Sequence, residues 1–210
     1  MSDKQLSWKY AEEFVAERPE IAAARVHSSE LGVEPVSPAV GAQLALLAAA
    51  TGAKNIIEVG TGVGVSGLWI LTGSPSALLT TIDSEIDHQQ VARSIFTEAG
   101  IQANRVRQIG GKAAEVLPRM NESSYDLVFI DADPQSVIEY VEHGLRLVRP
   151  GGVVAVAHAL WHDRVADPAQ RDATVAGFRS LLKEISQSEA VISSLIPVGD
   201  GLLQLTKLSD

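Results

Sequence analysis

The chain has 210 residues, of which 46% are apolar, and carries a formal net charge of -9. This length and composition predict a single domain with a sizeable core. The seventeen basic residues are scattered, so no basic stripe offers a nucleic-acid surface, and the absence of cysteine excludes disulfides, thiolate metal sites and cysteine nucleophiles.

The N-terminal segment shows neither a targeting signal nor a membrane span. Residues 1–5 lack the basic and then apolar order of a signal peptide, and no run of about 18 apolar residues follows. We therefore expect a cytoplasmic protein without a membrane partner. Apolar spacing over residues 7–26, interrupted by Pro19, predicts two short helices. We expect one domain over residues 1–210, with residues 1–34 as a helical extension and 35–206 as its core.

The remaining chain alternates between strand and helix patterns. Ser37 and Pro38 form an N-cap and first-turn pair for a helix that ends near Gly52. Strands are predicted at 56–59, 79–82, 104–109, 127–130 and 153–156, and helices at 66–73, 87–99, 111–120, 135–147 and 172–187. Residues 191–195 and 201–206 predict a closing hairpin around the turn at 198–201. The pattern indicates a Rossmann-like, doubly wound α/β fold with seven strands, mostly parallel, and an antiparallel C-terminal hairpin.

A glycine-rich turn follows the first of these strands. Gly60, Gly62 and Gly64 stand on alternate positions, whereas the dinucleotide fingerprint is G-x-G-x-x-G, and Val65 occupies its last position. Glu58, two residues before the first glycine, suits a cationic ligand group better than a pyrophosphate. The turn therefore favours S-adenosylmethionine (SAM), which carries an ammonium and a sulfonium; an ordinary strand-to-helix turn is the alternative.

Residues at the ends of the next strands are candidates for binding the rest of such a cofactor. Asp83 lies 21 residues after Gly62 and is placed to accept hydrogen bonds from ribose hydroxyls. Its alternatives are a helix cap or a solvated loop, and Glu85 is a less favoured substitute. Gly110 and Gly111 would let an adenine approach the backbone, or simply form a turn.

Polar residues also follow the two later strands. Asp131 and Asp133 could hold a hard cation, orient a substrate, or serve as charges at a helix N-terminus. His158 and His162, with Trp161 and Asp163, suggest a substrate-facing loop, although a lone histidine is more often structural. Pro150 to Gly152 predict a turn into the buried strand.

These pieces together resemble a class I SAM-dependent methyltransferase, and more narrowly the small O-methyltransferase family that includes caffeoyl-CoA and catechol O-methyltransferases. The resemblance covers about residues 35–206, which we expect to form the cofactor-binding core. It is carried by residues 36–38, 57–66, 81–83, 125–133 and 147–152. It implies that the methionine moiety is contacted by Glu58, Gly60 and Ser66. The ribose would be bound by Asp83, and the adenine would be surrounded by Gly111, Lys112 and Ala113. Gly62 and Asp131 complete the implied cofactor site. It also implies a homodimer formed through the N-terminal helices.

The chain departs from the family pattern at the catalytic positions. The family usually follows Asp-Ala-Asp with lysine, the proposed base, where this chain has Pro134. The family's metal-binding Asp-Asn pair is replaced by Ala157 and His158, which leaves Asp131 as a possible ligand. A metal is therefore doubtful, and His158, His162, Asp131 or Asp133 would have to act as the base.

Three functions compete at this point. The first is SAM-dependent O-methyl transfer to a small hydroxylated molecule, with an eroded metal site. The second is a catalytically degenerate protein that binds the cofactor and serves as a sensor or partner. The third is an NAD(P)-dependent oxidoreductase, which the glycine spacing and Glu58 disfavour.

Overall fold

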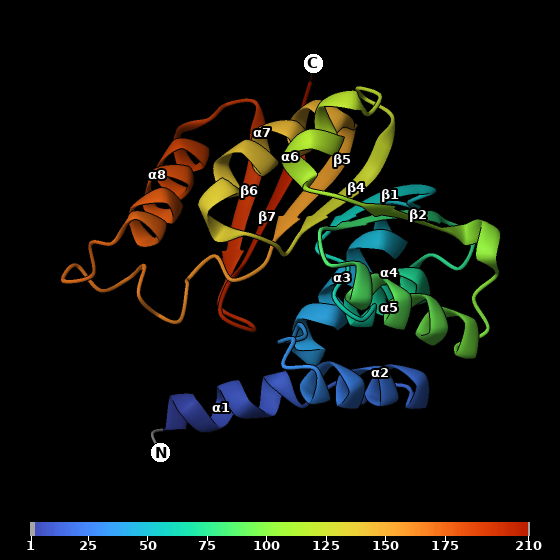
Figure 1. Ribbon diagram of the computed structural model, residues 1–210. Coiled ribbons are helices and arrows are strands. Elements are labelled where there is room, and N and C mark those ends of the chain that lie inside the picture. Colours follow the sequence, from blue (N-terminus) through green and yellow to red (C-terminus); the bar gives the residue numbers. More distant parts are fainter. Residues whose placement is uncertain (1–2, 210) are drawn as a thin grey trace.

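The computed structural model describes residues 3–209 and contains one mixed sheet between two layers of helices (Figure 1). The strands are β1 Asn55–Val59, β2 Leu78–Asp83, β3 Val106–Gly110, β4 Tyr125–Ile130, β5 Val148–Val156, β6 Val191–Ile196 and β7 Leu202–Lys207. The helices are α1 Asp3–Glu12, α2 Pro19–Glu30, α3 Pro38–Ala50, α4 Val65–Gly73, α5 Ile86–Glu98, α6 Ala113–Val116, α7 Val137–Leu147 and α8 Ala173–Gln187. Short 3-10 turns cover Ala103–Arg105, Leu117–Arg119 and Pro134–Ser136.

The strand order is β3-β2-β1-β4-β5-β7-β6. Strands β1 to β5 pair in parallel, while β7 runs antiparallel to both β5 and β6. The predicted fold class is therefore confirmed, including the antiparallel C-terminal hairpin. The order reverses between β1 and β4, and ligands of doubly wound sheets bind beyond the carboxyl ends of the strands at such a point.

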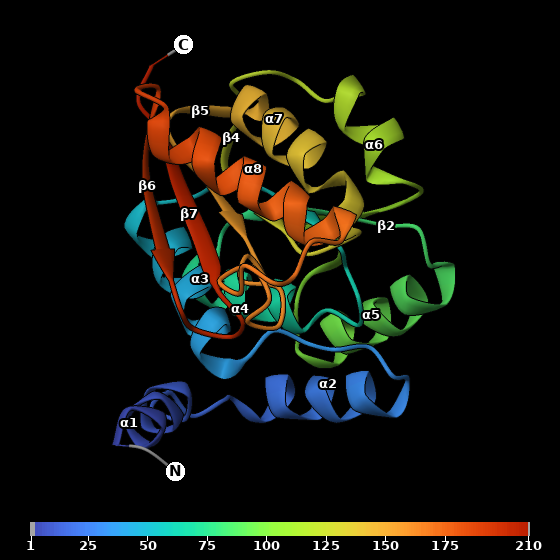
Figure 2. The same ribbon diagram turned by 90° about the vertical axis from the view of Figure 1, so that its left-hand side faces the viewer.

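Alternate residues of each central strand enter opposite hydrophobic cores. Ile56 and Phe129 pack with α3, α4 and α5 on one face, whereas Ile57 and Val128 pack with α6, α7 and α8 on the other. Figure 2 shows these two helical layers on either side of the sheet. Burial on both faces explains why the strands appear in the sequence as continuous apolar runs.

The N-terminal helices lie outside the layer of α3, α4 and α5 (Figures 1 and 2). Arg25 of α2 forms an ion pair with Glu17 at 2.6 Å and donates to the carbonyl of Val36 at 2.7 Å. The carboxylate of Glu17 also accepts from the indole of Trp69 at 3.3 Å. These contacts fasten the loop at residues 31–37 beside the glycine turn. Within residues 3–209, none of the helices combines the length and the apolar character that a bilayer span requires.

Two elements differ from the sequence-based expectation. The helix predicted at 111–120 is only α6 followed by a 3-10 turn, because Pro118 lacks an N–H and its ring clashes with the helical position before it. Pro150 to Gly152 do not precede the strand but form a bulge inside β5, where the register with β4 shifts. The cap at Ser37 is confirmed, because its hydroxyl accepts from the Val40 N–H at 3.3 Å.

Candidate functional site

The glycine turn connects β1 to α4 at the point where the strand order reverses. Gly60 has φ 95°, and a Cβ there would lie 1.8 Å from the carbonyl oxygen of Asp131. Gly64 precedes α4 with φ 94°, and its Cβ would lie 3.1 Å from the ring of Phe96. Close packing against the backbone of Asp131 thus requires glycine at position 60, a reason that the sequence alone did not reveal. At position 64 it is the positive φ that favours glycine.

Glu58 of β1 is fully buried beneath this turn. One carboxylate oxygen accepts from the hydroxyl of Ser66 and the other from the hydroxyl of Thr81, each at 2.6 Å. Burial raises the pKa of Glu58 to about 7, while the two hydroxyls oppose the rise. Ser66 lines a cavity, so Glu58 can act on a ligand through Ser66.

Asp83 at the end of β2 organises the same turn. Its Oδ2 accepts from the backbone N–H of Gly62 at 2.9 Å, and its Oδ1 accepts from that of Glu85 at 2.9 Å. The side chain therefore does not cap α5, whose N-cap residue is Glu85. The helix-cap alternative is wrong, and Asp83 lies at the wall of a cavity where a ribose could reach it.

Three neighbouring cavities lie along the carboxyl ends of the strands and share lining residues. We call them the first, second and third lobes. The first lobe, about 340 Å³, is lined by residues that include Gly60, Asp83, Gly111, Lys112 and Ala113. The second, about 80 Å³, lies between the glycine turn and the loop before α3 and is lined by Glu34, Gly60, Gly62, Ser66 and Asp131 among others. The third, about 20 Å³, includes Asp131, Asp133, His158, Trp161 and Phe178.

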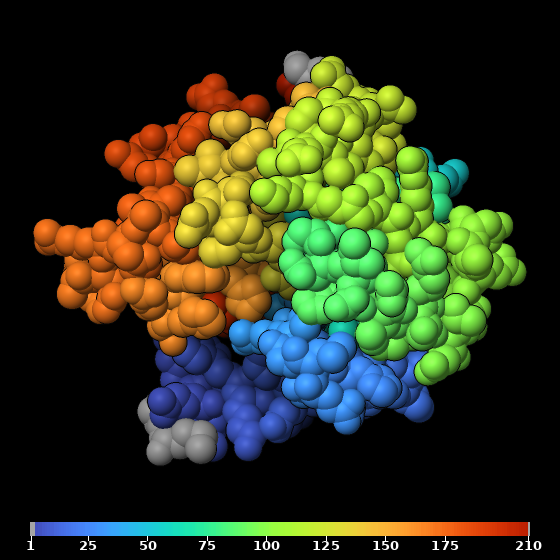
Figure 3. Space-filling view, in the orientation of Figure 1, coloured from blue at the N-terminus to red at the C-terminus, as the bar shows by residue number. Residues whose placement is uncertain are grey.

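Segments that are far apart in the sequence form this cleft. Figure 3 shows the blue N-terminal part, the green region after β2, the yellow start of α7 and the orange loop after β5 meeting near the centre of one face. Asp131 lines both the second and the third lobe. A ligand held in the second lobe would therefore meet one held in the third beside this carboxylate.

Asp131 and His158 line the third lobe, and Asp200 contacts the other side of the His158 ring, so the three side chains form a row. Nε2 of His158 lies 3.6 Å from Oδ1 of Asp131, and Nδ1 lies 3.2 Å from Oδ2 of Asp200. Burial raises the pKa of Asp131 above its ordinary value, and the neighbouring imidazole opposes this rise. The site thus contains an imidazole whose two nitrogens face two different carboxylates.

The other two candidate bases are placed less favourably. Asp133 acts as a cap, because its carboxylate accepts from the Gln135 N–H at 3.3 Å and the Ser136 hydroxyl at 2.7 Å. Asp133 therefore serves as a charge at a helix N-terminus, which was one of its predicted roles. Its side chain also borders the cleft. The side chain of His162 is 56% exposed and does not line the third lobe.

The donor set does not fit the divalent metal that the resemblance implies. Ala157 offers no ligand, and the ring nitrogens of His158 are directed at Asp131 and Asp200. Across residues 3–209, no three His, Asp or Glu side chains converge in a way that could hold a metal ion. Magnesium prefers a shell of oxygen ligands, and one carboxylate beside an imidazole does not supply it.

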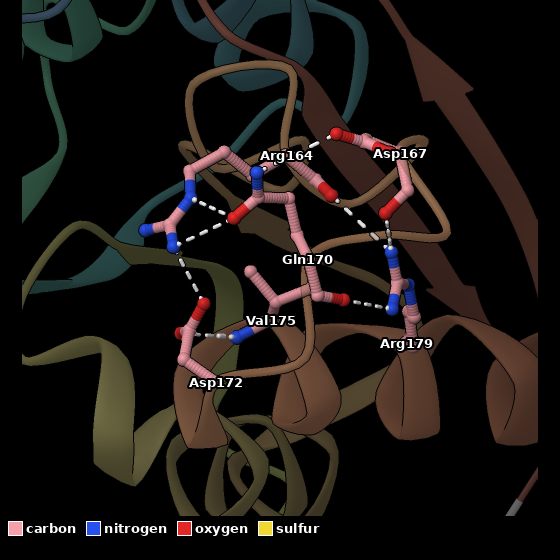
Figure 4. A network of polar contacts seen from close by, with 6 residues as sticks. All are labelled: Arg164, Asp167, Gln170, Asp172, Val175 and Arg179. Atoms are coloured by element: carbon pink, nitrogen blue, oxygen red, sulfur yellow. Dashed lines mark hydrogen bonds and ion pairs between the residues drawn. The ribbon is translucent and has the colours of Figure 1, made fainter.

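The loop between β5 and α8 is braced from α8 (Figure 4). The guanidinium of Arg179 donates to four loop carbonyls, among them those of Val165 at 2.9 Å, Gln170 at 2.6 Å and Arg164 at 3.3 Å. Arg164 in turn forms an ion pair with Asp172 at 2.6 Å, and Asp172 caps α8 through the Val175 N–H. This network stabilises the segment that follows His158 and Trp161.

Sequence reasoning missed Glu34, which lines the second lobe, and Asp200, which contacts His158 of the third lobe. Asp200 lies in the hairpin turn between two glycines, so its pattern indicated only a turn. Glu34 stands in a proline-rich loop and carried no signal beyond a loop. Neither residue could have been found without knowing which loops the fold brings together.

Comparison with known proteins identifies related sequences. A family model described as O-methyltransferase matches residues 9–208. A Mycobacterium avium protein named as an O-methyltransferase is 49% identical to this chain over 195 residues. The aligned residues cover 92% of this chain and 88% of that protein.

Solved structures give the same picture. The O-methyltransferase TomG from Streptomyces achromogenes, involved in tomaymycin synthesis and solved in complex with SAM, is 30% identical with a TM-score of 0.87 and full coverage of both chains. An O-methyltransferase from Bacillus cereus in complex with SAH is 27% identical with a TM-score of 0.84, covering 96% of this chain and 97% of the other.

Proposed function

Because the chain belongs to the O-methyltransferase family, we propose that it transfers the methyl group of SAM to a hydroxyl of a small molecule. The observation that carries this proposal is the three-lobed cleft, whose walls contain the residues that the resemblance assigned to the cofactor, except the buried Glu58. These residues are distributed over the first two lobes in the order that an adenosine joined to a methionine requires.

We place the adenosine in the first lobe and the methionine in the second. Asp83 borders the first lobe and can accept hydrogen bonds from ribose hydroxyls, while Gly111 to Ala113 surround the adenine. Ser66 and Asp131 border the second lobe, where Asp131 supplies a carboxylate for the ammonium. Glu58 holds the Ser66 hydroxyl in place from below.

The acceptor hydroxyl then enters the third lobe, whose volume of about 20 Å³ holds a hydroxyl and not a whole ring, and there it faces both Asp131 and His158. Bound SAM supplies an electrophilic methyl group, which makes a C–O bond to the acceptor as the C–S bond breaks. The chain must hold the acceptor oxygen in line and remove its proton. His158 is the group we assign to this proton transfer, because Nε2 lies 3.6 Å from Asp131 and is not committed to a close hydrogen bond.

The test begins with calorimetric titration of SAM and S-adenosylhomocysteine, with and without magnesium, followed by turnover of a panel of catechols and phenols. His158→Gln should lower kcat by about 100-fold or more while cofactor affinity stays within about threefold. His162→Gln is the matched control and should stay close to wild type.

Each alternative has its own outcome in this experiment. Tight cofactor binding without turnover of any acceptor would favour the degenerate sensor or partner. Binding of NAD(P) in place of SAM would favour the oxidoreductase and overturn the proposal. An active enzyme with unchanged kcat in His158→Gln would retain the methyltransferase but remove His158 as the base.

A further inference from the structure

A turn distant in the sequence contacts the imidazole at the centre of the site. Asp200 lies between β6 and β7, 42 residues after His158, and its Oδ2 is 3.2 Å from Nδ1 of that histidine. Its other oxygen, Oδ1, accepts from the backbone N–H of His162 at 2.6 Å and that of Asp163 at 3.4 Å. The carboxylate thus holds both the ring of His158 and the backbone of the loop that carries it.

The backbone at this junction is held in unusual conformations. Six non-glycine residues among 3–209 have positive φ, and five of them belong to the junction. These are His158, Trp161, His162, Asp163 and Asp200. Each such conformation is unfavourable by about 1 kcal/mol or more for a side chain with a Cβ, so it persists only where surrounding contacts impose it.

Neighbouring contacts fix the turn that carries Asp200. The N–H of Leu160 donates to the carbonyl of Asp200 at 2.9 Å, and that of Ala159 donates to the carbonyl of Gly201 at 2.9 Å. From the other side, the carboxylate of Glu12 in α1 accepts from the Gly199 N–H at 2.6 Å. The turn is therefore held between the loop after β5 and the N-terminal helix.

We infer that Asp200 is a positioning residue that accepts the Nδ1–H of His158 and thereby turns an unprotonated Nε2 toward the acceptor hydroxyl. This inference rests on the proposed function for its catalytic meaning. The chemistry follows from the imidazole: in its neutral form one nitrogen donates and the other accepts, so the partner of Nδ1 decides the state of Nε2. Asp200 lines neither the third lobe, proposed for the acceptor, nor the first two lobes, proposed for the cofactor. It therefore acts through His158.

Asp200→Asn is the informative variant because asparagine tolerates positive φ. Its carbonyl oxygen would stay on the N–H groups of His162 and Asp163, which places the amide NH2 against Nδ1 of His158. Nδ1 would then have to accept, and the hydrogen would move to Nε2. We expect kcat to fall by about 100-fold or more, with acceptor KM and S-adenosylhomocysteine affinity within about threefold.

Nitrogen-15 NMR of the His158 ring separates this role from a purely structural one. At about pH 9, well above the ordinary imidazole pKa of about 6.5, wild type should show hydrogen on Nδ1 and Asp200→Asn should show it on Nε2. Asp163→Asn, a change of a neighbouring exposed acid in the same loop, should match wild type in both tautomer and kcat.

The inference is overturned if wild type carries the hydrogen on Nε2, or if Asp200→Asn folds and leaves the tautomer unchanged. The wild-type spectrum decides the question even where the variant fails to fold. The tautomer needs no cofactor or acceptor, so a failure of the proposed methyl transfer would leave this measurement interpretable.

Discussion

The carboxylate of Glu58 accepts a hydrogen bond from the hydroxyl of Ser66 at 2.6 Å in a fully buried setting. Ser66 lies in the first turn of α4 and Glu58 in β1, so this contact joins the strand and the helix on either side of the glycine turn. An ionisable group therefore supports the wall of the proposed methionine site, which makes both stability and binding sensitive to its charge.

Glu58→Gln should flatten the pH dependence of stability. Burial raises the pKa of Glu58 from 4.5 to about 7, so between these values the folded state binds more protons than the unfolded state. The contribution of Glu58 to the free energy of unfolding is therefore fully present below about pH 4.5. It is lost as the pH rises to about 7, and the loss amounts to about 3 kcal/mol. Urea unfolding at pH 5 and pH 7.5 measures the loss. Glu98→Gln changes an exposed position and should leave the pH dependence of the free energy of unfolding as in wild type. The same pH dependence in Glu58→Gln would contradict the raised pKa of Glu58.

Gly60→Ala should disrupt the cleft. The added Cβ would meet the carbonyl oxygen of Asp131 at 1.8 Å, so β1 and β4 would have to separate at their carboxyl ends. We expect a loss of several kcal/mol in the free energy of unfolding together with loss of S-adenosylhomocysteine binding. Gly100→Ala is the control, because Gly100 also has a positive φ, 74°, but open space around it. If thermal denaturation shows the same loss of stability in Gly60→Ala and Gly100→Ala, backbone strain and not the clash is responsible.

Asp83→Asn should weaken cofactor binding more than it weakens the fold. Its carboxylate accepts from the N–H of Gly62 and is proposed to accept from the ribose, and loss of charge at such a hydrogen bond reduces binding by about 10- to 100-fold. Calorimetry with S-adenosylhomocysteine measures the change. Asp87→Asn removes the same charge from the first turn of α5 and should have little effect; comparable weakening there would point to long-range charge alone.

Arg179→Ala should loosen the loop between β5 and α8. Four carbonyls of this loop would lose their donor; Figure 4 draws those of Arg164, Asp167 and Gln170. A hydrogen bond to a charged group contributes about 1.5 to 3 kcal/mol. We expect faster tryptic cleavage after Arg164 and Arg171 and a raised acceptor KM, with unchanged cofactor affinity. Lys183→Ala, one turn further along α8, is the control. Unaltered cleavage in Arg179→Ala would mean that other contacts hold the loop.

The proposed homodimer can be tested on α1. None of its residues is buried, and Leu6 and Tyr10 lie one turn apart on it with exposures of 52% and 73%. Phe14, just beyond the end of α1, is 73% exposed. If this face forms the dimer, Tyr10→Glu should shift the protein to a monomer in sedimentation, because a buried unpaired charge is unfavourable. Ile192→Glu, on the exposed edge strand β6, should not. Dissociation by the Ile192 change alone would assign the interface to β6.

The sequence by itself determined the elements of the fold and the first part of the site. Runs of apolar residues predicted all seven strands, and the position of Asp83, 21 residues after Gly62, made it the candidate for the ribose. The structure joins these two residues by a hydrogen bond of 2.9 Å. These features follow from local rules: a strand or helix needs only its own pattern, and residues that end neighbouring parallel strands must lie at one edge of the sheet.

Only the tertiary structure decided how the third lobe is built. Asp200 meets His158 across 42 residues, and Glu12 meets the turn at Gly199 across 187. The clash that makes Gly60 necessary also comes from another strand, through the backbone of Asp131. Such contacts depend on the angle and depth at which loops pack, and these are set by the whole core. No periodicity or spacing within the chain encodes them, whereas the residues that form the elements carry their pattern in the sequence itself.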